Sequence, residues 1–270
     1  MVKNDHILTR FELKLIRSVI IYRKFAITTR ESIVLDKKAN TIPPDREDSS
    51  KLSFVSWNIQ KGIKTESYRD LINLVEEKDF VLIQEAVLDP RLFESIGDDY
   101  YWNFSKGYQQ RSRITGLMTA SRYKPVSHEE VISWEPWLGT PKATSISKYS
   151  IPKLGNDLMV VNIHSINFTF GIKEYMQQIN KIHEYLTEHS GPVVLSGDFN
   201  TWRRKRSDIL NQLAVEHNLE PIQFSVDHRK QVFGQKLDHI YVRSLSLESA
   251  HAPYTRSSDH SPMTAHFDLN

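Results

Sequence analysis

The 270-residue sequence contains no cysteine. This absence excludes disulfide bonds, zinc sites built on thiolates and cysteine nucleophiles, and it leaves oxygen ligands and histidine as the available metal chemistry. The chain also lacks a strong charge of either sign, since its formal net charge is +2. A balance this mild does not by itself predict nucleic-acid binding, so any phosphate-binding surface must be local.

A long hydrophobic run is also missing. Residues 1–40 contain nine Lys and Arg against four Asp and Glu, and residues 13–25 carry apolar side chains at helical spacing. This segment is too short and too charged to span a bilayer and does not resemble a secretory signal, so we expect a cytoplasmic protein with no transmembrane segment. A basic amphipathic helix here would pack on its own domain, or make a peripheral contact with an anionic membrane or a nucleic acid.

Residues 41–50 (T-I-P-P-D-R-E-D-S-S) form a polar, proline-marked linker in this interpretation. We therefore expect a basic extension and linker over residues 1–50 and the main domain over residues 51–270. In the main domain, the patterns predict strands over 52–57, 80–83, 114–121, 126–133, 144–150, 157–163, 193–195, 237–243, 245–251 and 262–269, and helices over 68–77, 171–189 and 206–218. Helices and hairpins mixed in this way predict two sheets packed face to face, with helices outside.

The stretch P-V-V-L-S-G-D-F-N-T-W over residues 192–202 can be interpreted in two ways. Val193 to Leu195 has the pattern of a buried strand, which Gly197 ends, and Asp198 and Asn200 follow. These two residues could form an Asx turn that closes the strand. They could also direct a carboxylate and an amide into one reactive site.

Other predicted strands favour the reactive site, because they also deliver polar residues at their ends. Four apolar strands are followed by Asn58, Glu85, His164 and Asp198, and a fifth begins just after Asp259 and His260. Strand ends are where loops converge into a cleft, so we expect these side chains to share one site.

Six short motifs in this order resemble the endonuclease/exonuclease/phosphatase superfamily, whose fold is that of DNase I. They are S-W-N-I-Q at Asn58, L-I-Q-E at Glu85, V-N-I-H-S at His164, S-G-D-F-N-T-W at Asp198, L-D-H-I at Asp238 and S-S-D-H-S-P at Asp259. The W-E-P-W segment at residues 134–137 makes the chain most similar to the bacterial YafD-like proteins. The resemblance covers residues 51–270 and implies an α+β fold, a four-layer α/β/β/α sandwich of two mixed sheets flanked by helices.

The resemblance implies a divalent cation at this site. Glu85 would be the principal ligand of a magnesium or manganese ion (Mg2+ or Mn2+), which prefers carboxylate and water oxygens. Asn58 would be a second ligand or would orient the site, and Asp259 would add negative charge at the metal.

The resemblance also implies catalytic roles for the remaining motif residues. Asp198 would be the general base, and Asn200 would hold the attacking water or the scissile phosphate. His260 would stabilise the transition state as an imidazolium, with Asp238 accepting a hydrogen bond from its other ring nitrogen. His164 would contact the phosphate or assist the leaving group.

The chain departs from the family pattern in two places. DNase I-like members steady the histidine that corresponds to His164 with a glutamate from the strand matching residues 114–121, and that strand contains no glutamate here. The tyrosine of the apurinic endonuclease branch has no counterpart near residues 162–168. We therefore do not expect repair of abasic sites.

Two further sets of residues are candidates for substrate contact. Arg203 and Arg204 begin a basic run that could meet a phosphate backbone or form a solvated surface. Trp134 and Trp137 could stack on a base or sugar, or pack beneath a proline-containing loop.

The function we expect is that of a metal-dependent phosphodiesterase or nuclease that acts by in-line attack of a water activated by Asp198, with nucleic acid as the partner. Two alternatives remain open: a phosphoesterase acting on phospholipids or inositol phosphates at a membrane surface, and a non-catalytic binding module on the same fold. The oligomeric state cannot be inferred from the sequence.

Overall fold

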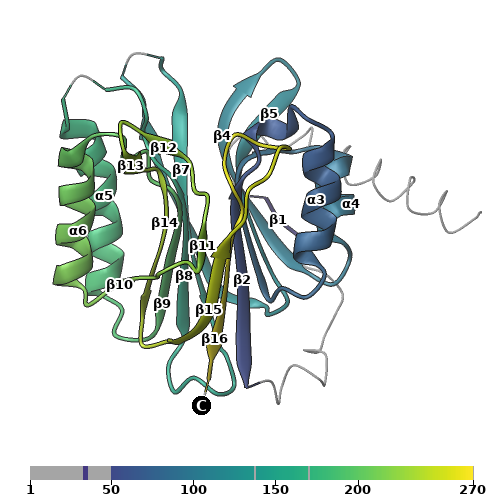
Figure 1. Ribbon diagram of the computed structural model, residues 1–270, viewed down its shortest axis with the longest axis vertical. Coiled ribbons are helices and arrows are strands. Elements are labelled where there is room, and N and C mark those ends of the chain that lie inside the picture. The colour runs from purple at the N-terminus through teal and green to yellow at the C-terminus, as the bar shows by residue number, and fades with distance from the viewer. Residues whose placement is uncertain (1–32, 36–49, 137, 170, 270) are drawn as a thin grey trace, which may run out of the picture.

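The computed structural model describes residues 33–35, 50–136, 138–169 and 171–269. Two sheets pack face to face. Helices α3 (Glu66–Val75) and α4 (Pro90–Ile96) cover the outer face of one sheet, and α5 (Lys173–Thr187) and α6 (Arg204–Glu216) cover the outer face of the other (Figure 1). The expected four-layer α/β/β/α sandwich is confirmed. The predicted amphipathic helix within residues 1–40 and Trp137 lie outside the described residues.

The larger sheet has eight strands. Their order is β1 (Ile33–Leu35), β4 (Tyr101–Gln110), β5 (Arg113–Ser121), β3 (Phe80–Val87), β2 (Lys51–Asn58), β16 (Met263–Asp268), β15 (Ser246–Ala252) and β11 (Val226–Asp227). The central strands β2 and β3 run parallel, so their C-terminal ends meet at the same edge of the sheet. Strand β1, which comes from the N-terminal 50 residues, pairs with β4 at the sheet's edge.

The smaller sheet has six strands. Their order is β10 (Glu220–Pro221), β14 (Asp238–Arg243), β9 (Val193–Asp198), β8 (Leu158–His164), β7 (Pro141–Tyr149) and β6 (Pro125–Trp134). Its central strands β8 and β9 are also parallel. A separate two-stranded hairpin, β12 (Gln231–Val232) with β13 (Gln235–Lys236), and a short 3-10 helix, η1 (Gln60–Gly62), are the remaining elements of the described residues.

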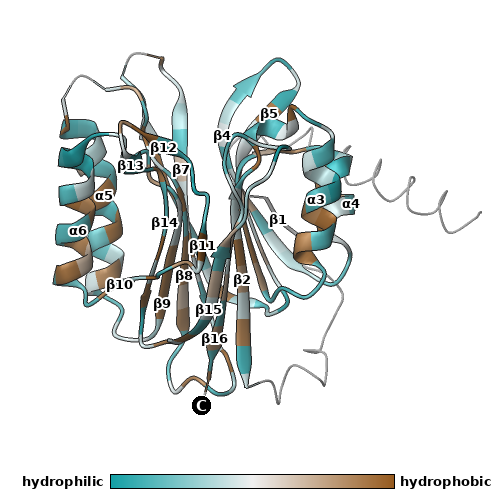
Figure 2. Cartoon of the chain, viewed as in Figure 1, coloured by the Kyte–Doolittle hydropathy of each residue, from teal (hydrophilic) through white to brown (hydrophobic). Residues whose placement is uncertain are grey.

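Three apolar layers hold the sandwich together. Between the sheets, Phe80 stacks on Phe54 with ring centroids 4.5 Å apart and meets Tyr149 edge to face at 5.0 Å. A second layer joins the larger sheet to α3 and α4, and a third joins the smaller sheet to α5 and α6. Figure 2 shows the hydrophobic residues concentrated on the strands and on the sides of the helices that face the sheets. Burial of this apolar surface is the main force that holds the strand ends in place.

The structure contains elements that were not predicted. Strand β4 contains glycine and several polar residues, and helix α4 has only seven residues that begin with proline. The strands β1 and β10 to β13 have only two or three residues each, too few to show a pattern. The strand predicted to end at Ile83 continues to Val87, so Glu85 lies inside β3 and not after it. Among the described residues, no helix combines the length and apolar character needed to cross a bilayer.

Candidate active site

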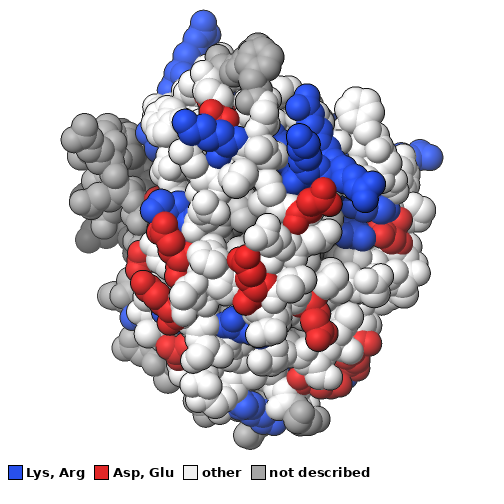
Figure 3. Space-filling view, turned by 90° about the vertical axis from the view of Figure 1, so that its left-hand side faces the viewer, with Lys and Arg blue, Asp and Glu red and all other residues white. Residues whose placement is uncertain are grey.

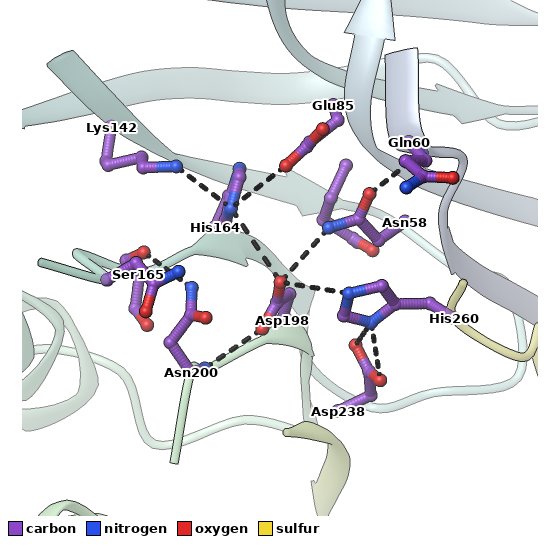
Figure 4. Close-up of polar contacts among 12 residues, drawn as sticks. Asn58, Gln60, Glu85, Lys142, His164, Ser165, Asp198, Asn200, Asp238 and His260 are labelled. Carbon is purple, nitrogen blue, oxygen red and sulfur yellow. Dashed lines mark hydrogen bonds and ion pairs between the residues drawn. The ribbon is translucent and has the colours of Figure 1, made fainter. Parts of the chain in front are cut away.

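The parallel strand pairs bring the motif residues together at one end of the sandwich. In the larger sheet, Asn58 at the end of β2 lies opposite Gln84, the residue before Glu85. In the smaller sheet, Asp198 at the end of β9 lies opposite His164 on one side and Asp238 on the other. Side chains from both sheets therefore converge between the sheets, as the sequence predicts (Figure 4).

Local backbone geometry turns two of these side chains into the site. Glu85 and Asn200 both have a φ of +49°, in the left-handed region that residues other than glycine seldom adopt. The pairing of β3 with β5 shifts register between Ile83 and Ala86, so Glu85 sits at a β-bulge. Bulges re-aim side chains, and strained residues of this kind cluster at functional sites.

Asp198 is a buried carboxylate that faces the cleft, with 2% of its surface exposed. Its Oδ2 accepts a hydrogen bond from Nδ2 of Asn58 at 3.0 Å, and its Oδ1 accepts one from the backbone N–H of Asn200 at 2.9 Å. The second bond closes an Asx turn, and this turn presents Asp198 to the cleft, so the two interpretations of this stretch are compatible. Burial raises the pKa of Asp198, and the positive charge of His260 opposes that rise.

His260 and Asp238 form a buried pair beside Asp198. The Nδ1 atom of His260 lies 2.8 Å and 3.0 Å from the two carboxylate oxygens of Asp238, and its Nε2 lies 3.8 Å from Oδ2 of Asp198. Burial lowers the pKa of His260, but the carboxylates of Asp238 and Asp198 outweigh that effect and raise the pKa to about 9. The imidazole is therefore a cation at neutral pH.

Glu85 presents a partly exposed carboxylate to the cleft. Its carboxylate is 22% exposed and lies 4.0 Å from Nζ of Lys61 and 3.8 Å from Nε2 of His164. No described residue donates a hydrogen bond to it, so its oxygens remain available at the cleft. Asn58 presents its Oδ1 on the adjacent strand end, where it accepts a bond from the backbone N–H of Gln60 at 3.0 Å. Carboxylate and amide oxygens are the donors that Mg2+ and Mn2+ prefer, so these residues fit such an ion.

Asp259 lies at the edge of the site. Its carboxylate is 41% exposed, forms an ion pair with Lys230, and has one oxygen 4.0 Å from Nε2 of His260. Nζ of Lys230 also lies 3.2 Å from Nε2 of His260, so this lysine bridges the two residues. In the structure, the negative charge of Asp259 is therefore paired with the positive charge of Lys230.

His164 contacts a lysine that was not among the predicted site residues. Nζ of Lys142 lies 3.1 Å from Nε2 of His164, whose same nitrogen lies 3.7 Å from Oδ2 of Asp198. Unlike His260, His164 has no carboxylate within hydrogen-bonding distance among the described residues, so the contact with Lys142 favours the neutral imidazole. Burial, followed by the charge of Lys142, holds the pKa of His164 well below its ordinary value.

The basic run after Asp198 divides into residues with different surroundings. Arg206 is buried and donates hydrogen bonds to the carbonyl oxygens of Ile166 (2.7 Å), Asn200 (2.9 Å) and Asn167 (2.8 Å). Arg203 is exposed and lies over the ring of Trp202, which lines the cleft, with 4.3 Å from its guanidinium carbon to the ring centroid. Arg204 is exposed in the first turn of α6.

Glu135, the residue after Trp134, is a buried carboxylate in the cleft wall that connects two loops. Glu135 accepts hydrogen bonds from the backbone N–H of Asn167 at 2.8 Å and from the hydroxyl of Thr140 at 2.5 Å, and it lies 4.0 Å from Nζ of Lys142. Trp134 itself is exposed and does not line the cleft.

These residues surround a cleft of about 840 Å³ that opens at the end of the sandwich. Its lining includes the acidic residues Glu85, Asp198 and Asp259, the imidazoles of His164 and His260, and the three lysines 61, 142 and 230. A buried carboxylate, a neighbouring imidazolium, a partly exposed carboxylate and lysine side chains at one cleft suit chemistry on a phosphate ester.

Comparisons with known proteins agree with this geometry. A family model described as the endonuclease/exonuclease/phosphatase family matches residues 55–260. A UPF0294 protein of Vibrio parahaemolyticus is 34% identical over 226 residues, which are 83% of this chain and 80% of that protein.

Two solved structures share the fold at lower identity. A TDP2 from D. rerio, solved with a single-strand DNA product, has a TM-score of 0.58 and 16% identity over 82% of this chain and 100% of that one. A mannosyl-6-phosphatase of Bacteroides thetaiotaomicron has a TM-score of 0.60 and 16% identity over 80% of this chain and 99% of that one.

Proposed function

Since the chain belongs to the endonuclease/exonuclease/phosphatase family, we propose that it is a divalent-metal-dependent phosphoesterase that cleaves phosphodiesters by in-line attack of water. The observation that carries this proposal is the position of Asp198. Its Oδ2 lies 3.8 Å from Nε2 of His260 and 3.7 Å from Nε2 of His164, in a cleft that Glu85 also lines. One buried carboxylate thus faces an imidazolium, a neutral imidazole and a group able to hold a cation.

Glu85 and Asn58 would hold the Mg2+ or Mn2+ ion, with Asp259 adding negative charge from the cleft edge. Such an ion neutralises the charge on the non-bridging oxygens of a bound phosphate. The protein's contribution is to keep the carboxylate of Glu85 at the cleft and to fix the side chain of Asn58 on the adjacent strand.

Asp198 is the general base in this proposal. Its carboxylate accepts the proton of the attacking water while the side chain of Asn58 and the backbone of Asn200 hold it in place. A pKa raised by burial makes a carboxylate a better base, which supports this role. Asn200 is itself fixed, because its Nδ2 donates to the carbonyl of Ser165 at 3.0 Å.

His260 and Lys142 supply positive charge on either side of Asp198. The imidazolium of His260, stabilised by Asp238, neutralises charge that develops on the phosphate oxygens. Lys142 takes the same part on the other side, because the neutral His164 carries no charge and orients the ammonium group. In this proposal Lys142, and not a glutamate, is the partner of this histidine.

Nucleic acid is the first substrate class that we propose, since the TDP2 structure similar to this chain was solved with a single-strand DNA product. A second candidate is the phosphodiester of a phospholipid, which the exposed apolar side chains around the cleft mouth favour.

A substrate panel on the purified full-length chain tests the proposal. Single-stranded DNA, duplex DNA, RNA, phospholipid, bis(p-nitrophenyl) phosphate and p-nitrophenyl phosphate are incubated with Mg2+, with Mn2+ and with EDTA. We expect metal-dependent hydrolysis of at least one diester, faster than that of the monoester. The absence of hydrolysis with either metal across the panel would contradict the proposal, as would equal rates in EDTA.

A further inference from the structure

Five large apolar side chains surround the mouth of the cleft and are exposed to solvent. This apolar rim consists of Ile63, Tyr108, Leu138, Phe168 and Phe233, all of which line the cleft. Phe233 is 85% exposed, Ile63 65% and Leu138 58%. A folded protein gains nothing from leaving such side chains in water, and apolar patches that are this exposed mark sites of interaction.

The rim is assembled from separate loops on both sheets. Ile63 follows η1 and Tyr108 belongs to β4, on the side of the larger sheet. Leu138 lies in the loop between β6 and β7, and Phe168 lies in the loop between β8 and α5. Phe233 stands at the tip of the β12–β13 hairpin, where it and Gly234 have φ values of +51° and +76°. Positive φ at both central positions is typical of a tight hairpin turn, so the backbone holds the Phe233 side chain outward.

Exposed basic side chains accompany the rim. Lys61 lines the cleft next to Ile63, and Arg113 donates a hydrogen bond to the Lys61 carbonyl at 2.6 Å. Arg203 and Arg204 stand exposed beside Trp202. Figure 3 shows Lys and Arg gathered in the upper part of the face formed by α5 and α6, with Asp and Glu mostly below them. The apolar rim is therefore flanked by exposed lysine and arginine side chains.

We propose that the apolar rim docks the mouth of the cleft onto an anionic phospholipid bilayer. Side chains from loops on both sheets can enter one interface together, while the lysines and arginines beside them meet the anionic head groups. The inference does not rest on the proposed catalytic function, because docking needs neither a metal nor a reaction.

A bilayer suits the rim better than a nucleic acid does. Nucleobases stack on flat rings, and Ile63 and Leu138 offer none. A platform for stacking also presents one face of a ring from a groove, whereas Phe233 is exposed almost completely. Hydrocarbon takes up aliphatic and aromatic side chains alike, so it accounts for all five residues of the rim.

Co-sedimentation with vesicles tests the proposal. The full-length chain carrying Glu85→Ala is used in EDTA, so that binding is measured without hydrolysis, on vesicles of phosphatidylcholine alone and of phosphatidylcholine with phosphatidylglycerol. We expect binding to the mixed vesicles, and we expect the double variant Phe233→Ser and Leu138→Ser to bind about tenfold more weakly or less. Val215→Ser is the matched control, because Val215 is 79% exposed in the last turn of α6, away from the rim.

Three outcomes would overturn the proposal. One is equal vesicle binding by the rim variant and the parent chain, and another is an equal loss in the Val215→Ser control. The third is no binding to anionic vesicles. Binding of a single-stranded oligonucleotide that the rim variant loses would then assign the rim to nucleobases. Circular dichroism of each variant checks that it is folded, which the exposure of all three substituted positions leads us to expect.

Discussion

Nζ of Lys142 lies 3.1 Å from Nε2 of His164, and this contact changes the electrostatics of one half of the site. A carboxylate beside a histidine favours the imidazolium, whereas an ammonium group favours the neutral ring. The positive charge on this side of Asp198 is therefore on the lysine. On the other side, Asp238 stabilises the charged form of His260, so Asp198 lies between a neutral and a charged imidazole.

Replacing Lys142 should reduce activity more than it reduces stability. We expect Lys142→Met to lower kcat/KM by about 100-fold, the effect of removing one preorganised donor from a transition state, and Lys142→Arg to recover part of the loss because it restores the charge. The exposed Lys153→Met is the control and should behave like the parent chain. Steady-state kinetics on the best substrate of the panel measures the change, and an activity of Lys142→Met within twofold of the parent would remove Lys142 from the site.

Removal of the Glu85 carboxylate should abolish metal binding and activity together. We expect Glu85→Ala to lower activity by about 1,000-fold and to weaken Mg2+ or Mn2+ binding below detection in a calorimetric titration, because the principal anionic ligand is gone. The exposed Glu77→Ala variant is the control. Unchanged metal affinity in Glu85→Ala would place the ion elsewhere.

The pair of His260 and Asp238 predicts a dependence of stability on pH in the metal-free protein. The folded-state pKa of His260, about 9, is above its ordinary value of 6.5, so protonation stabilises the folded chain fully below pH 6.5 and this contribution is lost as the pH rises through 9. Urea unfolding in EDTA across this range measures it. Asp238→Asn removes the carboxylate that raises the pKa, so the loss of stability should occur at lower pH. An identical profile in that variant would show that Asp238 does not control the titration.

The sequence predicts the fold and most of the site because the same short segments encode both. A run such as Val193 to Leu195 is apolar enough to be recognised as a buried strand, and its polar continuation marks the strand end. The resemblance of six motifs to a known family then suggests roles, and the match over residues 55–260 confirms the family. The roles assigned to individual residues stay predictions.

The contacts that depend on strand register could not be predicted. Nothing in the local sequence around Lys142 marks it as different from other lysines. It reaches His164 because β7 runs antiparallel to β8 with Thr144 opposite Ile163, and a one-residue shift in that register would turn Lys142 away. The missing glutamate beside His164 was the one signal in the sequence, since it left the histidine in need of another partner.

The structural role of Arg206 could not be predicted from the sequence either. Its run of four basic residues predicts either a phosphate contact or a solvated surface, but the helical period turns Arg206 inward while Arg204 remains exposed. The guanidinium then ties together three backbone carbonyls, those of Ile166, Asn167 and Asn200. It therefore holds the loop after His164 against the turn that presents Asp198.

Replacement of Arg206 should therefore destabilise the fold, whereas replacement of Arg204 should not. We expect Arg206→Met to lower the free energy of unfolding by about 3 kcal/mol, because it leaves three carbonyl groups without their charged donor in a buried position. Arg204→Met should change it by less than about 0.5 kcal/mol, since an exposed side chain can be replaced at little cost. Denaturant unfolding of both variants measures the difference. Equal stability of the two would show that water replaces the guanidinium without loss, and that the other contacts of the loop, among them those with Glu135 and Gln178, are sufficient to hold it.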